Sequence, residues 1–572
     1  MQKKWAVKEK YPADFAKEFP GASPVVLQLL WNRGINTTAA IQEFLNPDYG
    51  KDLHDPFLFR DMKKAVERLF KAIDAKEKIF IFADYDADGV SAGTILMNTL
   101  KAYGADPGIY IPHRETEGYG LSAKAVDFIS AAGGKLIITC DCGISSRDEI
   151  AAAADRGIEV MVTDHHMQPA KLPDRAFALI HPKLEGETYP FKGLSGGGVA
   201  FKLAQGLLKT RIPAGMKDIE AFEKRLTELA AISSVADMVP LVGESRTLVH
   251  FGLVVLNKTT RIGLKKLYET AGIVPGKVDT YSIGFQIAPR INAAGRMDHA
   301  NTAFALLNAT DEVEATRLAL ALNSANIERQ KATQTIVDLA REQVIATNQE
   351  EKPVIILFDE KWAAGLIGLV AGKLVEEFNR PVFLFTKKND KEFVGSGRSI
   401  PAFNIIIAMQ SMPDAFLRFG GHPGAAGMSI EPEKFDAFRE RFVAHAAKEL
   451  ADKDLTPTLS IDAELALEDV TWELQKELEK IAPCGMNNPT PKYVARGLKV
   501  IEAAPVGAGG KHMRLSVCHT TKDVRKCIAF SMGDWIERLE PGTTVDAVFE
   551  VGVNEWNGNR ELQLKIVDLT LS

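Results

Sequence analysis

Between residues 78 and 237, short apolar runs rich in β-branched residues alternate with helical patterns, and this alternation constrains the fold most strongly. The runs cover residues 78–83, 135–139 and 159–163. Strands separated by helical segments are typical of parallel sheets built from βαβ units. The carboxyl ends of parallel strands meet at one edge of the sheet, where ligands bind. A fourth segment, 231–237, ends at that same edge and suits either a helix or a strand.

Carboxylates and imidazoles follow these runs directly. Three aspartates at alternate positions repel one another, because like charges within about 4–6 Å disfavour ionisation. A divalent cation removes that cost, and oxygen ligands with a few imidazoles suit magnesium or manganese better than structural zinc. Two such ions about 3.5–4 Å apart can hold both the attacking and the leaving oxygen of a phosphoryl transfer. The candidate ligands, enough for two ions, are Asp84, Asp86, Asp88, Asp141, His165 and Asp237.

Simpler interpretations exist for each motif taken alone. The run from Asp84 to Gly89 fits a solvated turn or half of a calcium loop, and Asp164 could cap a helix that carries core histidines. The position of the first run after a buried type of strand, and its repetition at two further strand ends, favour the metal site.

The rest of the chain divides by pattern. Residues 310–350 read as one helix, with neither Gly nor Pro from 311 to 350, and a helix of this length is expected to connect two domains. A second α/β unit over 351–452 contains two turns rich in glycine, and short alternating strands over 453–572 predict a small barrel. The expected fold class is therefore α/β: a parallel-sheet domain at 56–309 with a helical cap at 1–55, the connecting helix, the second α/β domain and the barrel.

Charge and hydropathy limit the environment and the partners. The net charge of −6 argues at first against a nucleic-acid partner, but residues 491–530 contain eight Lys and Arg against two acidic residues. With Phe530, Trp535 and Trp556 nearby, this segment suits single strands that are held by charge and stacking; a solvated barrel face is the simpler alternative. No apolar run reaches the ~18 residues that a membrane span needs, so we expect a cytoplasmic protein that contacts no membrane.

Together these motifs resemble a known superfamily. Residues 84–89 (DYDADG), 141–143, 164–166 and 235–241 are similar to motifs I to IV of the DHH phosphoesterases, and 395–398 with 420–422 resembles the DHHA1 domain. The complete order, including 289–296, the long helix, an OB-like tail and 482–489, resembles the bacterial RecJ family of single-stranded-DNA exonucleases.

The resemblance implies roles for the candidate ligands. Asp86 and Asp141 would hold one Mn²⁺ or Mg²⁺ ion, and Asp88, Asp141, His165 and Asp237 the other. Many DHH proteins carry a histidine where this chain has Phe82, and Asp84 or water would replace that ligand. Asp164 would orient an imidazole. His166 would contact the scissile phosphate or assist the leaving group.

Substrate residues are expected at the cleft. The resemblance places Ser396, Gly397 and Arg398, with Arg290 or Arg296, around a 5′-terminal phosphate, which Arg forks and backbone N–H groups bind well. His422 would face the same cleft. Arg114 would contact a backbone phosphate and Tyr119 would stack on a base. The simpler alternatives are a hairpin turn at 395–399, surface salt bridges for Arg290 and Arg296, and core packing for Tyr119.

The resemblance predicts a 5′-to-3′ exonuclease that hydrolyses single-stranded DNA to mononucleotides with two metal ions, in DNA repair and recombination. It also implies a monomer that works with a RecQ-type helicase and a single-strand-binding protein. Two alternatives remain open: a DHH phosphodiesterase for short oligonucleotides or cyclic dinucleotides, or a pyrophosphatase of that superfamily, and an inactive DHH scaffold that binds DNA without cutting it. The near-complete ligand set favours an active enzyme, and the barrel favours a long substrate.

Overall fold

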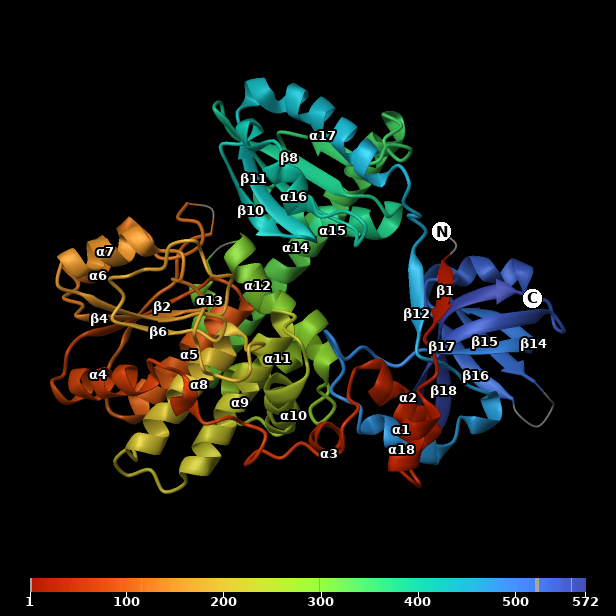
Figure 1. Ribbon diagram of the computed structural model, residues 1–572, viewed down its shortest axis with the longest axis horizontal. Coiled ribbons are helices and arrows are strands. Elements are labelled where there is room, and N and C mark those ends of the chain that lie inside the picture. Colours follow the sequence, from red (N-terminus) through yellow and green to blue (C-terminus); the bar gives the residue numbers. More distant parts are fainter. Residues whose placement is uncertain (1–2, 115, 298, 520–523, 557) are drawn as a thin grey trace.

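The structure is a computed structural model of the 572-residue chain, and it describes residues 3–114, 116–297, 299–519, 524–556 and 558–572. Figure 1 shows two α/β bodies beside a separate barrel, with both ends of the chain at the barrel. Lys522 and the side chain of Trp556, which belong to the basic and aromatic segment predicted for the tail, lie outside the described residues. Within the described part of the chain, no helix combines the length and the apolar character that crossing a bilayer requires.

The first domain contains the expected parallel sheet. Its five strands lie in the order β3-β2-β4-β5-β6, and every neighbouring pair is parallel. The strands are β2 (Ile79–Ala83), β3 (Gly108–Tyr110), β4 (Leu136–Cys140), β5 (Glu159–Thr163) and β6 (Ala178–Ile180). Because β2, β4 and β5 are adjacent and run in one direction, the three polar clusters that follow them meet at one edge.

Helices cover both faces of this sheet. Side chains alternate between the faces with the strand period of two, so Ile81 and Ala83 join one core cluster while Phe80 and Phe82 join the other. The first face is covered by α4 (Met62–Asp74), α5 (Ala87–Ala102) and α8 (Gly196–Thr210), and the second by α6 (Ala123–Ala131) and α7 (Arg147–Asp155). The sheet is therefore buried on both sides and can hold its strand ends rigidly.

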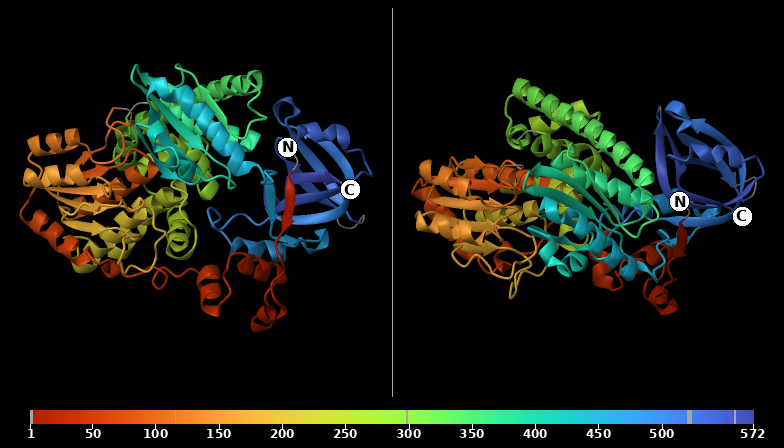
Figure 2. Two further views of the ribbon diagram at one scale, coloured as in Figure 1. Left: turned by 45° about the horizontal axis from the view of Figure 1, so that its top comes forward. Right: turned by 90° about the horizontal axis from the view of Figure 1, so that it is seen from above.

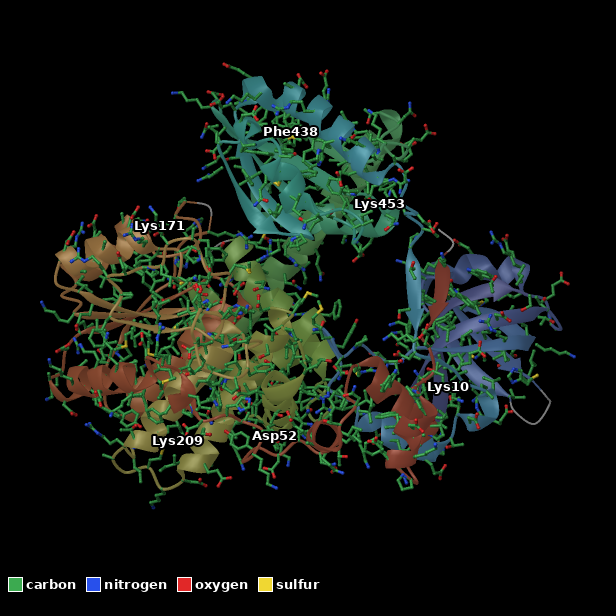
Figure 3. The ribbon with its side chains drawn as sticks, viewed as in Figure 1. Lys10, Asp52, Lys171, Lys209, Phe438 and Lys453 are labelled. Atoms are coloured by element: carbon green, nitrogen blue, oxygen red, sulfur yellow. The ribbon has the colours of Figure 1, made fainter. Side chains whose placement is uncertain are left out.

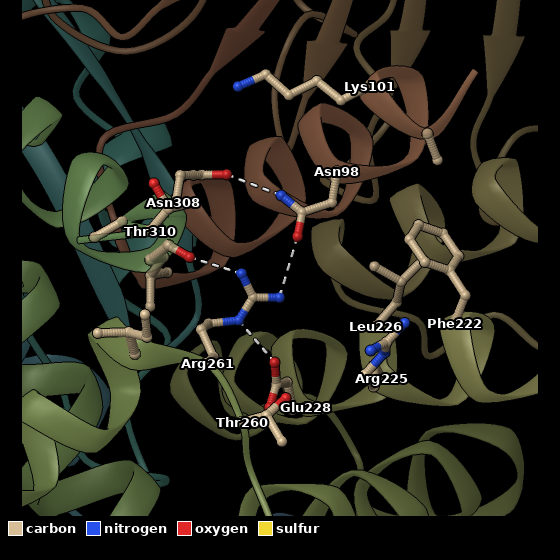
Figure 4. A pocket seen from close by; sticks show the side chains of 14 residues that line it. Asn98, Lys101, Phe222, Arg225, Leu226, Glu228, Thr260, Arg261, Asn308 and Thr310 are labelled. Carbon is tan, nitrogen blue, oxygen red and sulfur yellow. Dashed lines mark hydrogen bonds and ion pairs between the residues drawn. The ribbon is translucent and has the colours of Figure 1, made fainter. Parts of the chain in front are cut away.

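The segment at 231–237 is helical. It forms the last turns of α9 (Ile219–Ala236), and Asp237 is the C-terminal capping residue. Figure 4 shows how α9 is tied to its neighbours near its middle, where Glu228 accepts a hydrogen bond from Arg261 Nε at 2.7 Å. Arg261 also donates to Asn98 Oδ1 of α5 and to the Leu307 carbonyl of α13 (Asn301–Asn308). The two helices that begin or end at candidate ligands thus share one half-buried arginine.

Replacing Arg261 with methionine should lower the free energy of unfolding by about 3 kcal/mol, because Glu228 would stay buried without its partner. Glu228 is 4% exposed in its side chain and Arg261 13%. Urea denaturation of the full chain measures the change. Arg225, Glu228 and Arg261 all line one pocket of about 580 Å³, but Arg225 is exposed. Arg225→Met is therefore the control. Equal losses in the two variants would contradict the role of the ion pair.

A long helix joins the two α/β domains (Figures 1 and 2). It is α14 (Glu312–Ala346), and Asp311 caps its N-terminus by accepting from the Glu314 N–H at 2.8 Å. The second domain has the sheet order β10-β11-β9-β8-β7, in which the β7–β8 pair is parallel and the others antiparallel. Its strands are β7 (Ile355–Phe358), β8 (Val382–Asn389), β9 (Glu392–Arg398), β10 (Arg418–His422) and β11 (Ala425–Ile430).

Residues 395–398 lie within a strand, so the turn predicted there and the alternative hairpin turn at 395–399 are both wrong, whereas 420–427 does contain a turn, at 423–424 between β10 and β11. Gly395 and Gly397 lie within β9, where a Cβ atom would stand 2.5 Å from Phe385 Cε1 or from Ile405 Cδ1. The glycines therefore allow close packing over the aromatic core. That core includes Phe438 of α17 (Phe435–Leu450), labelled in Figure 3.

The C-terminal domain is a closed five-stranded barrel, because β14 pairs with both β15 and β17. The remaining neighbours are β15 with β16, β16 with β18, and β18 with β17. The strands are β14 (Tyr493–Val506), β15 (His512–Cys518), β16 (Arg525–Ala529), β17 (Thr544–Trp556) and β18 (Asn559–Leu571). Five antiparallel or mixed strands in a small closed barrel correspond to the OB-like tail that was predicted.

Most of the predicted N-terminal cap packs against this barrel, and only its later part, such as Tyr49, packs on the first domain. β1 (Lys4–Val7) pairs in parallel with β12 (Thr458–Ile461), and Phe15 and Leu29 belong to the barrel's core cluster. They come from α1 (Ala13–Glu18) and α2 (Pro24–Asn32). Figure 3 shows Lys10 beside the barrel and Asp52 beside the first domain, so the chain crosses between them. Because β12 is so distant in the sequence, the local pattern of the N-terminal residues could not predict this pairing.

The segment 482–489 fastens the barrel to the first domain. Arg246 of α10 (Gly243–Leu256) is 2% exposed and donates to the carbonyl oxygens of Lys480 and Ala482 at 2.9 and 2.6 Å. The Leu241 N–H donates to the Met486 carbonyl at 2.8 Å. The segment thus contacts the loop that directly follows Asp237.

Candidate metal centre and substrate cleft

Asp84 and Asp86 lie in the tight turn between β2 and α5, and Asp88 lies in the first turn of α5. Asp86 caps α5, because its Oδ1 accepts from the backbone N–H groups of Asp88 and Gly89 at 2.9 and 3.0 Å. Gly89 must be glycine, since a Cβ atom there would stand 2.5 Å from the Asp84 carbonyl oxygen. Strand, turn and helix start are therefore packed closely enough to point neighbouring carboxylates at one spot.

Asp88 is held by the start of α8 across the domain. Its two oxygens accept from the Gly196 and Gly197 N–H groups at 2.8 and 2.7 Å, and Ser233 Oγ donates to Oδ1 at 2.5 Å. A helix N-terminus favours a negative charge. The arrangement fixes the Asp88 carboxylate in one orientation.

Asp141 follows β4 in a conformation that residues other than glycine rarely adopt. Its φ is +62°, in the left-handed region that Asn and Asp tolerate better than most residues. A Cβ atom at Gly196 would lie 2.5 Å from the Asp141 Cβ, so α8 begins directly against this side chain. The strained backbone aims the Asp141 carboxylate at the same spot as the first motif.

The histidines follow β5 and have different surroundings. His165 Nε2 lies 3.1 Å from Asp141 Oδ1, 3.4 Å from Asp237 Oδ2 and 3.7 Å from Asp88 Oδ2. His166 Nδ1 lies 2.8 Å from Asp164 Oδ1. Asp164 also accepts from the backbone N–H groups of both histidines and of Ile144. The imidazole that Asp164 orients is therefore that of His166.

Three overlapping groups bring their ligand atoms within 4.8 Å of one another. The groups are Asp84 with Asp86 and Asp141, Asp88 with His165 and Asp237, and Asp141 with His165 and His166. Asp84 thus lies with the aspartates, whereas Phe82 is fully buried and stacks on Tyr110.

Several atoms of these groups lack the partners that buried polar atoms normally have. Among the described residues, Asp84 Oδ1, Asp141 Oδ1 and both ring nitrogens of His165 are buried without a hydrogen-bond partner. Hard carboxylate oxygens with one imidazole suit magnesium or manganese. The donor set fits two divalent ions that share Asp141.

The electrostatics agree with this fit. Burial and the neighbouring carboxylates raise the pKa values of Asp84, Asp86 and Asp141 above their usual range, and they raise the pKa of Asp237 to about 8. Burial lowers the pKa of His165 to about 4, which keeps its imidazole neutral, as a metal ligand must be. Burial opposes the charge on His166 as well, but the hydrogen bond and the charge of Asp164 outweigh it and raise the pKa to about 9.

Tyr119 lies beside the histidines at the surface. It is 47% exposed, so core packing does not explain it. Its hydroxyl lies 2.9 Å from His166 Nδ1 and donates to the Asp141 carbonyl at 3.1 Å. The tyrosine therefore contacts His166 and the backbone of the second motif.

The predicted arginines lie on both sides of the boundary between the α/β domains. Arg114 stacks over Tyr85 of the first motif, with 5.0 Å from its Cζ to the ring centre. Arg296 of α12 (Ala288–Met297) donates to the Gly365 carbonyl at 2.7 Å, at the start of α15 (Ala364–Phe378). Arg290 is bonded to Asn323 Oδ1 and the Gln286 carbonyl. Within the described part of the chain, none of the three has a carboxylate partner in an ion pair, so the salt-bridge alternative fails for Arg290 and Arg296.

On the other side of the boundary, Arg398 Nη1 donates to Ser396 Oγ at 3.0 Å and to the Gly397 carbonyl at 2.9 Å. Burial and then the charge of Arg114 lower the pKa of Arg398, so the positive charges of the two guanidinium groups act on each other. The strand register pairs Arg398 with Ala425 and Ala425 with His422. Directly paired residues share a face of the sheet, which puts His422 on the same face as Arg398 and Ser396.

Sequence reasoning missed the residues that hold the site together. Gly196, Gly197 and Ser233 position Asp88, and Asn292 Oδ1 accepts from the Ala87 N–H of the first motif at 2.7 Å. The sequence does contain one sign of these residues, a run of glycines at 196–198 directly after a capping serine. Such a run marks a helix start that an anion, here the Asp88 carboxylate, can approach closely.

Comparisons with known proteins agree with this geometry. Models of the DHH family N-terminal domain, the DHHA1 domain and the RecJ OB domain match residues 78–233, 351–448 and 461–568. The single-stranded-DNA-specific exonuclease RecJ of Bacillus subtilis is 37% identical over 551 residues, which cover 96% of this chain and 68% of that protein. RecJ of Salmonella typhimurium is 31% identical over 97% of this chain and 98% of its own length. This chain belongs to the RecJ family.

Solved structures of RecJ agree. The crystal structure of RecJ in complex with Mn²⁺ from Thermus thermophilus has a TM-score of 0.83 at 29% identity, over 100% of this chain and 80% of that one. The crystal structure of exonuclease RecJ bound to manganese has a TM-score of 0.59 at 33% identity, over 69% of this chain and 98% of that one. The predicted family and fold class, a DHH domain, a DHHA1 domain and an OB domain, are confirmed.

Proposed function

We propose that the chain is a metal-dependent exonuclease that hydrolyses single-stranded DNA to mononucleotides from the 5′ end, in DNA repair and recombination. The observation that carries the proposal is the meeting of two features at one place. Carboxylates and one neutral imidazole, several of whose buried atoms have no hydrogen-bond partner in the described residues, form the first feature. The second is a group of nearby arginines that have no carboxylate partner in the described residues. The RecJ relatives are named as exonucleases specific for single-stranded DNA.

Two divalent ions, Mn²⁺ or Mg²⁺, would be held by the groups described above. Asp84, Asp86 and Asp141 would bind one ion, and Asp88, Asp141, His165 and Asp237 the other. When bound, such ions offset the repulsion among the carboxylates and stabilise negative charge that develops on a phosphate. The orphaned atoms of Asp84, Asp141 and His165 support this assignment.

His166 would act on the substrate directly. Its ring is partly exposed, and the Asp164 hydrogen bond raises its pKa to about 9, so at neutral pH it can donate a proton or a hydrogen bond. Asp164 would keep that ring oriented, and the Tyr119 hydroxyl contacts the same ring nitrogen, Nδ1. We infer that His166 binds the scissile phosphate or assists the leaving 3′ oxygen.

The 5′-terminal phosphate would be bound between the two α/β domains. Ser396, Gly397 and Arg398 lie on one side, and Arg114 and Arg296 on the other. Arg296 suits this role better than Arg290, because Arg290 already makes two hydrogen bonds to its own surroundings. A pocket for the terminal phosphate would make the enzyme act from one end only.

The glycines around His422 would let a strand approach the sheet closely. A Cβ atom at Gly420 or Gly427 would meet no atom within 4 Å, so the backbone of β10 and β11 is accessible there. Glycine in a strand often marks a place where a ligand comes close to the backbone. His422 is exposed on the same face and would contact the same strand.

The barrel would bind the part of the DNA strand that lies away from the scissile phosphate. Lys499, Lys511 and Arg514 have no carboxylate partner among the described residues, and Phe530 is 52% exposed. Other basic residues of this stretch are already neutralised: Arg496 pairs with Glu464 and Asp546, and Lys526 with Glu561. Free cations with an exposed aromatic ring suit single strands.

Replacing Arg398 with alanine should remove most of the preference for a 5′ phosphate. Losing a charged hydrogen bond to phosphate costs about 1.5–3 kcal/mol, or roughly 10- to 100-fold in kcat/KM. The change is measured as the ratio of kcat/KM for 5′-phosphorylated and 5′-hydroxyl strands of one sequence. Arg439→Ala is a control on an exposed helix of the same domain. An unchanged ratio in the Arg398 variant would refute the phosphate site.

A RecQ-type helicase and a single-strand-binding protein are proposed partners, because an enzyme specific for single strands needs separated DNA. We also propose that the chain works as a monomer in the cytoplasm. Co-purification of the full chain with each candidate partner, with and without DNA, tests the interactions.

The proposed activity is tested by adding manganese to the purified chain with a long single strand, the matching duplex and a dinucleotide. We expect nucleotide release from the long strand at a much higher rate than from the other two. Faster turnover of the dinucleotide would favour a phosphodiesterase for small substrates. Manganese uptake with DNA binding but no cleavage would favour an inactive scaffold.

A further inference from the structure

A groove opens between α14 and α15 beside Arg398. Its volume is about 780 Å³, and its lining includes Arg398, Arg329 of α14, and Gly368 and Gly372 of α15. The groove therefore starts at the residue proposed to bind the 5′-terminal phosphate. It continues along the two helices, away from the carboxylates of the metal centre.

Glycines shape the groove. A Cβ atom at Gly368 would stand 3.0 Å from Ser396 Oγ and 3.1 Å from Arg398 Nη2, so this glycine lets both polar groups lie against α15. One turn further, a Cβ atom at Gly372 would meet nothing within 4 Å. Residues four apart lie on the same helix face. The groove is therefore tightly packed at Gly368, beside the phosphate site, and has free space at Gly372.

The groove is basic. Arg329, Lys331, Lys373 and Arg398 face one acidic residue, Glu376, and none of the four cations forms an ion pair within the described residues. Lys373 Nζ makes a hydrogen bond of 3.3 Å to Gln334 Oε1. The Arg329 Nε is buried and has no hydrogen-bond partner in the described part of the chain. Arginine and lysine side chains without an ion-pair partner suit a ligand with several phosphates.

Arg329 links the groove to the phosphate site, because it lines the groove together with Arg398. Burial, together with the charges of Arg114 and Arg329, lowers the pKa of Arg296 to about 10. The charge of Arg329, which lines the groove, therefore also acts on Arg296. An anion bound at Arg296 and Arg398 would have its next negative group beside Arg329.

We propose that this groove binds phosphates that extend beyond the 5′-terminal one, so that the chain degrades 5′-triphosphorylated as well as 5′-monophosphorylated single strands. The inference rests on the proposed function, because the innermost phosphate must occupy the site at Arg398. The two outer phosphates then lie along α15 towards Lys373.

The first cut on such a strand has a distinctive product. The oxygen of a water molecule bonds to the phosphorus between the first two nucleosides, the bond from that phosphorus to the 3′ oxygen breaks, and the 3′ oxygen takes up a proton. The first product is therefore a deoxynucleoside triphosphate. The shortened strand keeps a 5′ monophosphate, so every later product is a monophosphate.

The test compares two strands of identical sequence, one with a 5′ triphosphate and one with a 5′ monophosphate, with the full chain and manganese. Anion-exchange chromatography measures the triphosphate released in the first cut. Lys373→Glu adds a negative charge to the groove, and Gly372→Leu adds a side chain at a position where a Cβ atom would meet nothing within 4 Å. Each is expected to lower kcat/KM for the triphosphate strand about tenfold, a loss typical of one charged contact, and for the monophosphate strand less than about threefold. Arg329 is a poorer choice, because its charge also acts on Arg296.

Lys448→Glu is the control, since Lys448 is exposed on α17 of the same domain. Three results would overturn the proposed role of the groove while leaving the proposed function intact. They are degradation of the monophosphate strand alone, release of pyrophosphate before the first nucleotide, and equal losses of kcat/KM on both strands in the groove variants. Degradation of neither strand by the unaltered chain would overturn the proposed function and the groove with it.

Discussion

Replacing Asp141 with asparagine is expected to reduce strand cleavage by about three orders of magnitude or more, with little change in the affinity for single-stranded DNA. Asp141 belongs to two of the three ligand groups, and its Oδ1 is buried without a hydrogen-bond partner in the described residues. An amide would supply one neutral oxygen in place of a carboxylate shared by two ions. Single-turnover cleavage and fluorescence-based DNA binding measure the two quantities.

Asparagine is preferred over alanine here, because the backbone at position 141 has φ +62° and Asn tolerates that region. A loss of activity therefore reports on the carboxylate and not on backbone strain. Asp148→Asn on the exposed start of α7 is the control. More than a tenth of the original activity in the Asp141 variant would refute the shared-ligand role.

Replacing Asp164 with asparagine should lower kcat about 100-fold while leaving KM nearly unchanged. The Asp164 carboxylate accepts from three backbone N–H groups and from His166 Nδ1. An amide can accept through its oxygen only, and its NH₂ group would face further N–H donors. His166 would lose the partner that sets its orientation and its charge.

Manganese uptake separates this variant from the first one. Asp164 belongs to none of the ligand groups, so its asparagine variant should still bind manganese with the original stoichiometry, whereas the Asp141 variant should lose at least one ion. Loss of both manganese and activity in the Asp164 variant would mean that Asp164 supports the metal site and not His166.

The strand ends could be predicted from the sequence because their signals are local. An apolar run followed at once by carboxylates places Asp84, Asp141 and His165 at one edge, whatever the rest of the chain does. Whether the 231–237 segment is a helix or a strand could not be resolved in that way. Its residues suit a helix or a strand, and packing of α9 against α10 and α5 decides for the helix.

Long-range contacts explain the remaining differences. Asp88 depends on Ser233, 145 residues away, and β1 depends on β12, so neither contact leaves a local pattern. The glycines of β9 suggested a turn because glycine is common in turns. Their actual role, close packing over Phe385 and Ile405, becomes visible only when the sheet and its core are assembled.

The central claim, that the metal centre cuts single strands from a bound 5′ end, is tested most directly by a time course on strands that carry a label at either end. With manganese and a 5′-phosphorylated DNA strand, a 5′ label should appear at once as a mononucleotide, while a 3′-labelled strand shortens through a ladder of intermediates. Immediate release of a 3′ label as a mononucleotide, or internal fragments from both labels, would contradict the account.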